Sequence, residues 1–175
     1  MVECRVVVCA VTCVSCLILQ IISLVSPGWI YENAGIFTGF WMNCTVLKDS
    51  NLNCELLNNY HLWLDADLRR YTLMVIAMEA TAVLFFVMAT IASWCMYCEE
   101  KSQRAAHVTI CCNIMAGTTI AAGQAVFALK IAAGIFNQLF ICFYLSTFVG
   151  LWALVNGVVM TCLTCRCRKT HAYKM

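Results

Sequence analysis

Long runs of apolar residues, separated by short polar segments, dominate the sequence. A helix that crosses the hydrocarbon core of a bilayer needs about 20 such residues. Four runs reach that length, and we expect transmembrane helices over residues 6–26, 71–97, 105–129 and 139–162. Their hydrophobicity is continuous rather than alternating, which favours helices over barrel strands. The pattern predicts an all-α membrane protein, with a single domain over residues 1–175 and a left-handed bundle of four transmembrane helices.

The composition agrees with this prediction. Hydrophobic residues make up 63% of the chain and charged residues 11%, whereas a typical globular domain has roughly 25% charged residues. These values exclude a water-soluble monomer and a disordered chain. The formal net charge is only +2 and there is no basic stripe, which excludes a nucleic-acid partner. The partner that the composition predicts is the lipid bilayer.

The basic residues predict the orientation of the helices, because cytoplasmic loops are enriched in Lys and Arg. Seven of the eleven basic residues lie in the two terminal segments and in the short connection between the second and third spans. We therefore expect a multi-pass protein of the plasma membrane with both termini in the cytoplasm. The tail would cover residues 163–175, and an extracellular loop would cover residues 27–70. The sequon Asn43-Cys44-Thr45 lies in that loop, so Asn43 is a candidate for N-glycosylation.

The 14 cysteines fall into groups with different expected roles. Cys44 and Cys54 lie in the extracellular loop, where the environment is oxidising, and we predict a disulfide bond between them. Cysteines at cytoplasmic helix ends are candidates for S-palmitoylation. This group contains Cys95, Cys98, Cys162, Cys165 and Cys167. Two of its C-x-x-C pairs leave a four-thiolate zinc site conceivable, but no knuckle loops hold them, and we expect no metal and no other cofactor.

Catalytic chemistry has no visible basis in the sequence. None of the cysteines has the neighbouring histidine that a Cys/His nucleophile would need. The three histidines lie in different segments, and there is no phosphate-binding loop. We therefore expect no catalytic residues and no enzymatic activity.

Several polar residues lie inside the predicted spans at matching depths. At about 1.5 Å per residue, Gln20, Glu79 and Gln124 are all about 8–12 Å below the outer surface. Asn113 and Asn156 lie at a similar depth from the inner surface. We expect two polar layers, with the Glu79 carboxyl hydrogen-bonded to the amides of Gln20 and Gln124.

An acid inside a membrane has two interpretations. It can mark an ion or proton path, or it can be a protonated residue that joins helices by hydrogen bonds. A path normally needs a second ionisable residue, and the spans offer none beyond His107 at the inner edge. The sequence therefore favours the helix-joining role for Glu79.

The extracellular loop has the pattern of a small β-sheet. Aromatic and β-branched residues predict strands over residues 29–31, 36–47 and 52–57, with turn residues at 32–35 and 48–51. Residues 59–70 have the pattern of a short amphipathic helix that leads into the second span. We expect a small antiparallel sheet above the bundle, joined by the Cys44–Cys54 bond.

The same loop resembles a known family. The residues that carry the resemblance are Trp29, Gly39, Phe40, Trp41, Cys44 and Cys54. Their order is similar to the W…G-L-W…C…C signature of the superfamily of claudins, peripheral myelin proteins and epithelial membrane proteins, with Phe40 in place of the usual Leu. The stretch 68–75, which includes Arg70, resembles the claudin entry to the second span. Residues 136–139 are similar to the claudin F/Y-N-P-L element, with Gln138 in place of Pro.

The resemblance implies a claudin-like fold and a role at cell–cell junctions. Claudins form tight-junction strands that create a paracellular barrier or an ion-permeable seam. The expected partners are therefore copies of this chain or other claudin-like proteins, laterally and across cells. Cation-selective claudins carry an acid just after the second signature Cys, and Glu55 occupies that place. The resemblance makes Glu55 a candidate selectivity residue.

Three departures from the claudin pattern leave an alternative open. Gly39 follows Trp29 by only ten residues, an interval closer to peripheral myelin and epithelial membrane proteins, and the second extracellular loop has only about nine residues. Residues 173–175 are Tyr-Lys-Met rather than the Tyr-Val end that PDZ scaffolds capture in claudins, so a PDZ partner would have to belong to another class. The alternative is a protein of the peripheral myelin or epithelial membrane type, or a channel-accessory subunit, that acts in cis on membrane organisation or on a partner.

Overall fold

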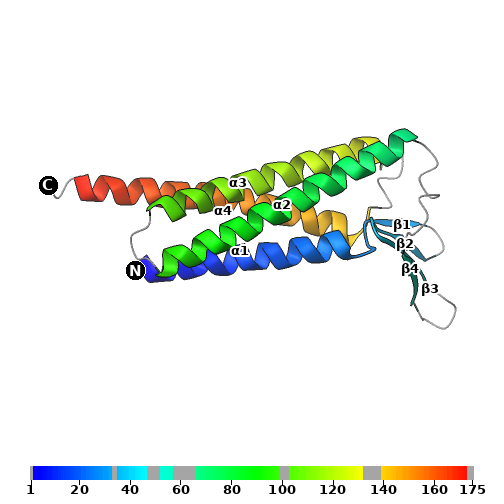
Figure 1. Ribbon diagram of the computed structural model, residues 1–175, viewed down its shortest axis with the longest axis horizontal. Coiled ribbons are helices and arrows are strands. Elements are labelled where there is room, and N and C mark those ends of the chain that lie inside the picture. The colour runs from blue at the N-terminus through cyan, green and yellow to red at the C-terminus, as the bar shows by residue number, and fades with distance from the viewer. Residues whose placement is uncertain are drawn as a thin grey trace.

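The computed structural model describes residues 2–32, 35–46, 52–56, 66–98, 103–131 and 139–172. The helices are α1 (Val2–Val25), α2 (Ala66–Cys98), α3 (Gln103–Val126) and α4 (Ile141–Ala172), and a π-helical segment, η2 (Phe127–Ile131), continues α3. The strands are β1 (Ile30–Glu32), β2 (Ile36–Thr38), β3 (Met42–Val46) and β4 (Leu52–Leu56). The four α-helices lie side by side, and the strands lie together at one end of them (Figure 1).

All four predicted spans coincide with long apolar helices. The segments that are long and apolar enough to cross a membrane are Val7–Val25, Arg70–Met96, Gln103–Ile131 and Ile141–Cys162. Each agrees with its predicted span to within two residues at either end. Large apolar side chains such as Leu84 and Leu151 remain exposed on the outside of the bundle. Such a surface fits lipid rather than water, so the helices are those of a membrane-embedded protein.

The helices form a closed arrangement in which each packs against two others. α1 contacts α2 and α4, and α3 contacts the same two helices. Small residues let α3 and α4 approach closely: a Cβ atom added to Gly117 would lie 2.7 Å from the carbonyl oxygen of Gly150. Close backbone approach of this kind is the usual way in which transmembrane helices gain packing energy.

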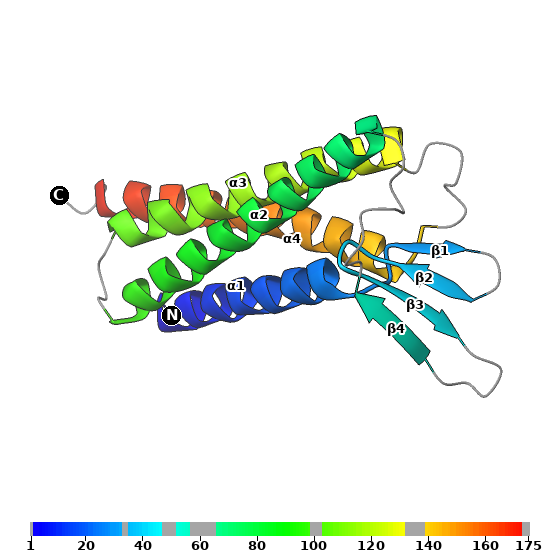
Figure 2. The ribbon, with the colours of Figure 1, turned by 45° about the vertical axis from the view of Figure 1, so that its right-hand side comes forward.

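The strands between α1 and α2 form an antiparallel sheet with the order β1-β2-β3-β4 (Figure 2). The register pairs Ile30 with Thr38, Phe37 with Cys44, and Cys44 with Cys54. The small antiparallel sheet is therefore confirmed. α1 begins at Val2 and α4 ends at Ala172, and both of these ends lie at the end of the bundle away from the sheet (Figure 1).

The prediction of one continuous strand over residues 36–47 is wrong, because the chain turns at residues 39–41 and makes two strands. The Gly39 N–H donates to the Met42 carbonyl at 3.0 Å and closes this turn. A Cβ atom on Gly39 would lie 2.6 Å from the Cα of Pro27. Only glycine allows the turn to pack against the backbone that follows α1.

Three further predictions concern the segments that follow β3, precede α2 and follow the fourth span. Of the amphipathic helix predicted over residues 59–70, residues 59–65 lie outside the described part of the chain, and residues 66–70 are the start of α2 itself. The turn predicted at residues 48–51 also lies outside it. α4 continues through most of the predicted tail to Ala172, because no proline or glycine follows Gly157 to interrupt it.

Candidate functional site

A cluster of aromatic side chains joins the sheet to the bundle. Trp29 lies at its centre and is only 1% exposed. Its ring centroid lies 4.3 Å from that of Phe40, in the β2–β3 turn, 5.1 Å from that of Phe127, in η2, and 6.5 Å from that of Phe143, in α4. The indole N–H donates to the carbonyl of Ser23 at 2.7 Å. The cluster is therefore packed on all sides and leaves the polar atom of Trp29 satisfied.

Backbone hydrogen bonds attach the same region to α4. The Phe140 N–H donates to the Trp29 carbonyl at 3.0 Å, and the Cys142 N–H donates to the Gly28 carbonyl at 2.8 Å. Leu139 also forms an isolated antiparallel bridge with Ile30 of β1. The segment that precedes α4 thus lies along the β1 edge, and the sheet is held in a fixed position on the bundle.

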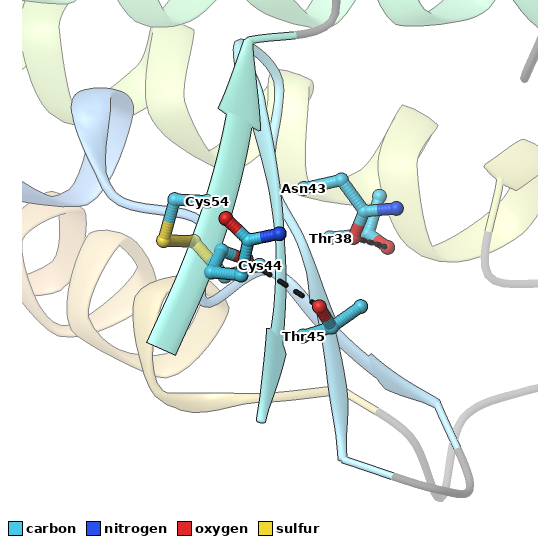
Figure 3. The surroundings of a disulfide bond; sticks show 6 residues. Thr38, Asn43, Cys44, Thr45 and Cys54 are labelled. Atoms are coloured by element: carbon cyan, nitrogen blue, oxygen red, sulfur yellow. Dashed lines mark hydrogen bonds between the residues drawn. A yellow bond between two sulfur atoms is a disulfide. The ribbon is translucent and has the colours of Figure 1, made fainter. Parts of the chain in front are cut away.

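The predicted disulfide bond is present between Cys44 and Cys54. The two residues are direct partners in the β3–β4 register. Figure 3 shows the bond on one face of the sheet, while the side chains of Thr38, Asn43 and Thr45 lie on the other face. A bond that closes so short a loop stabilises the fold by about 2–3 kcal/mol in the chain-entropy model.

The end strand β4 presents the candidate selectivity residue. Among the described strands, β4 has only β3 beside it. Glu55 is exposed and lies directly opposite Asn43, which puts it on the sheet face that lacks the disulfide. Nearby apolar side chains are exposed as well: Leu56 is 71% exposed and Trp41 is 45% exposed. This edge therefore combines an acid with apolar surface.

The glycosylation candidate Asn43 is integrated into the sheet. The Thr38 hydroxyl donates to Asn43 Oδ1 at 3.3 Å. The hydroxyl of Thr45, the third sequon residue, donates to the Asn53 carbonyl at 3.5 Å. Because Asn43 and Glu55 are partners on one face, a glycan on Asn43 would cover the face that presents Glu55. Glycosylation of Asn43 stays a prediction.

An outer polar layer, formed by Gln20, Glu79, Gln124 and Ser146, lies inside the bundle beneath the aromatic cluster. Glu79 accepts hydrogen bonds from Gln20 Nε2, from Gln124 Nε2 at 2.9 Å and from Ser146 Oγ at 3.0 Å. One residue comes from each of the four helices, and Gln20, Glu79 and Ser146 are completely buried. The predicted contacts of Glu79 with the two glutamines are confirmed.

An inner polar layer, formed by Cys13, Ser93, Asn113 and Asn156, also takes one residue from each helix. Asn113 Nδ2 donates to Cys13 Sγ at 3.5 Å, and Asn156 Nδ2 donates to Asn113 Oδ1 at 3.5 Å. Ser93 Oγ donates to Cys13 Sγ at 3.6 Å. The prediction that Asn113 and Asn156 lie in one inner layer is therefore confirmed, and the structure adds a hydrogen bond between them.

Apolar side chains separate the two polar layers. The cluster between them contains Cys16, Ala82, Phe86, Ala116, Ile120, Val149 and Ala153. On the outer side, the Trp29 cluster includes Val75, which lies one helical turn from Glu79. Within the described residues, neither hydrogen bonds nor buried polar groups connect the layers. This arrangement favours the helix-joining role of Glu79 over an ion path.

The remaining predicted residues lie on the outside of the bundle. Arg70 is exposed at the sheet end of α2. Cys95 and Cys162 are exposed free thiols near the other end of the bundle, a position that suits palmitoylation. The side chains of Cys98, Cys165 and Cys167 lie outside the described residues. In the described part of the chain, no group of three or more His, Cys, Asp or Glu residues could hold a metal ion.

Sequence reasoning missed five residues of these sites: Ser146 in the outer layer, Cys13 and Ser93 in the inner layer, and Phe127 and Phe143 in the Trp29 cluster. Ser146 lies seven residues into the predicted fourth span, at the same depth as Gln20 and Glu79. Its depth alone could therefore have assigned it to the outer layer. Phe127 and Phe143 complete the Trp29 cluster, but nothing distinguishes them from the other phenylalanines of the chain.

No family model matches the chain, and no curated protein matches it. The functional argument therefore depends on the residues and geometry described above.

Proposed function

We propose that the protein is a claudin-like component of cell–cell junctions, which contributes to tight-junction-type strands and to a paracellular barrier or an ion-permeable seam. The observation that carries the proposal is a four-stranded sheet held on a membrane-length four-helix bundle, with the end strand β4 exposed. The bundle would place the sheet at the outer surface of the plasma membrane. The sheet would then be the part of the molecule that meets other molecules.

The exposed edge supplies a basis for lateral association. An end strand presents N–H and C=O groups that can pair with another chain. The exposed side chain of Leu56 adds apolar surface on the same strand. A second copy of the chain, or another claudin-like protein, is the partner that we infer for this edge.

Glu55 would give such a seam its preference for cations. It is an acidic residue that is exposed on β4. Residues 30–70 contain three basic and five acidic residues, so this segment has a net charge of −2. A confined surface with one sign of charge concentrates the opposite ions.

Two experiments test the proposal. The first expresses the protein in fibroblasts that lack tight junctions and images the cell contacts by freeze-fracture. The second measures cation and anion permeability across epithelial monolayers that express it. We expect strands at contacts between two expressing cells. Replacing Glu55 by Gln should lower the cation-to-anion permeability ratio by about two- to five-fold, which corresponds to roughly 0.5–1 kcal/mol for one charge in an aqueous seam. The matched control is Glu32→Gln, which removes the same formal charge from β1, the strand at the other edge of the sheet, and should lower the ratio by less than Glu55→Gln does. Smooth contacts with uniform surface staining would contradict the junctional role.

The second candidate is a cis-acting role, as in peripheral myelin and epithelial membrane proteins or channel-accessory subunits. It is favoured by the connection between η2 and α4, where only residues 132–138 separate η2 from Leu139, which is bridged to β1. So short a segment leaves little chain to reach a neighbouring cell. Uniform staining together with a stable partner captured by crosslinking on the same cell would support this alternative.

A further inference from the structure

The buried carboxyl of Glu79 has only neutral neighbours in the described structure. α1 contributes Gln20, α4 contributes Ser146, and α3 contributes Gln124 and Gly123, where a Cβ atom would lie 3.4 Å from Glu79 Oε1. No Lys, Arg or His among the described residues forms an ion pair with it. Burying an ionised carboxylate without a compensating charge is costly, and more so at membrane depth. The site therefore requires a proton or another cation.

Gln124 supplies an independent observation. Its Nε2 donates to Glu79 Oε1 at 2.9 Å, whereas its Oε1 is buried and has no hydrogen-bond partner. The residue is only 6% exposed, so water does not readily compensate this oxygen. An acceptor without a donor thus lies beside a carboxyl group, and a carboxyl group becomes a donor when it takes up a proton.

We propose that Glu79 is a proton-binding site, in which the neutral carboxylic acid donates its hydrogen from Oε1 to the Oε1 of Gln124. A half-turn of the Gln124 amide exchanges its oxygen and nitrogen and brings the oxygen to the position 2.9 Å from Glu79 Oε1. That separation lies in the range of an O–H···O hydrogen bond. Glu79 Oε2 continues to accept from Gln20 and from Ser146.

The half-turn also places the amide nitrogen of Gln124 at the position where its oxygen has no hydrogen-bond partner. Inside a helix the backbone N–H groups are already used, but each carbonyl oxygen retains a second lone pair. A nitrogen at that position needs only a carbonyl oxygen with a free lone pair, whereas an oxygen there needs a donor and has none. Asn113 of the same helix makes such a bond, since its Nδ2 donates to the Thr109 carbonyl at 2.8 Å.

A proton fits the site better than a metal cation does. Sodium would need several oxygen ligands around it at once. Glu79 Oε2 is already bonded to the nitrogen of Gln20 and to the hydroxyl of Ser146. A proton needs only the one acceptor that Gln124 provides. Because apolar clusters lie on both sides of the layer, this proton is held in place rather than conducted.

Infrared difference spectroscopy in lipid nanodiscs tests the proposal. The spectrum of the wild type minus that of Glu79→Gln at neutral pH should contain the C=O stretch of a protonated carboxyl, and this band should shift when the protein is refolded in deuterated buffer. Gln keeps the size and neutrality of the acid, so this variant is expected to fold. The matched control Glu55→Gln, at an exposed position, should leave the band intact.

A second pair of variants tests the role of Gln124. Gln124→Leu removes the acceptor and should move the carboxyl band to higher frequency, as for a weaker hydrogen bond. The control Gln103→Leu, at an exposed position at the start of the same helix, should leave the frequency unchanged. A band that does not move in Gln124→Leu would overturn the assignment of the acceptor. If no protonated carboxyl is present, or if a carboxylate band responds instead when sodium is replaced by potassium, the proton site is wrong.

Discussion

The outer and inner polar layers draw on the same four helices but make different kinds of contact. In the outer layer, three of the helices donate to a single group on the fourth, with bonds of 2.9 and 3.0 Å from Gln124 and Ser146 to Glu79. In the inner layer, the shortest bonds stay within one helix. Asn113 donates to its own helix at 2.8 Å, and Ser93 does so at 2.7 Å. The contacts between helices in that layer are 3.5–3.9 Å long.

The difference shows what a buried polar residue contributes to helix association. A side chain that is already bonded to its own helix gains little from a long contact with a neighbouring helix. Most of the contacts between helices in the inner layer also involve sulfur, which is a weak acceptor. A side chain whose partners all lie on other helices loses them when the helices separate. The outer layer therefore holds the helices together, whereas the inner layer mainly satisfies polar groups in place.

The largest effect should come from Glu79→Leu, which leaves the polar groups of Gln20, Gln124 and Ser146 without their common partner. We expect a loss of about 2–3 kcal/mol in the free energy of unfolding, measured by titration with SDS in mixed micelles. The neutral isostere Glu79→Gln, which keeps an acceptor oxygen, should lose about 1 kcal/mol or less. Equal losses for the two variants would mean that side-chain shape, rather than hydrogen bonding, stabilises this layer.

A smaller effect is expected from Asn113→Leu in the inner layer. The substitution removes the contacts with Cys13 and Asn156, which are 3.5 Å long, and a bond within α3 that does not depend on the other helices. The expected loss in the same SDS titration is about 0.5–1 kcal/mol. A loss as large as that of Glu79→Leu would remove the distinction between the two layers.

Much of this arrangement could be predicted from the sequence because depth in a membrane follows from distance along a helix. Gln20, Glu79 and Gln124 were placed in one layer by counting residues from the helix ends, and the structure brings them together. The same count includes Ser146, but serine is common in such helices and depth alone does not show which face of the helix it occupies. The facing direction depends on how four helices pack, which no single span determines.

The sheet was harder to predict in detail. The Cys44–Cys54 bond and the strand content followed from compartment and residue type, and both are confirmed. The break at Gly39 was missed because aromatic and β-branched residues flank it on both sides, and one glycine inside such a run can equally mark a bulge within a single strand. The turn depends on the contact of Gly39 with Pro27, twelve residues earlier, and local propensity carries no information on such an approach.

The smallest effect tests the comparison most sharply, since Ser93 and Ser146 are both completely buried serines at helix interfaces. The Ser146 hydroxyl donates to Glu79 on another helix, whereas the Ser93 hydroxyl donates to the Ala89 carbonyl of its own helix and lies 3.6 Å from Cys13 Sγ. Replacement by Ala changes volume equally at the two sites, so packing terms largely cancel. We expect Ser146→Ala to lose about 1 kcal/mol and Ser93→Ala less than about 0.5 kcal/mol in the SDS titration. Equal losses would show that the thiol contact stabilises the inner layer as effectively as a carboxyl stabilises the outer one, because burial and volume are already matched.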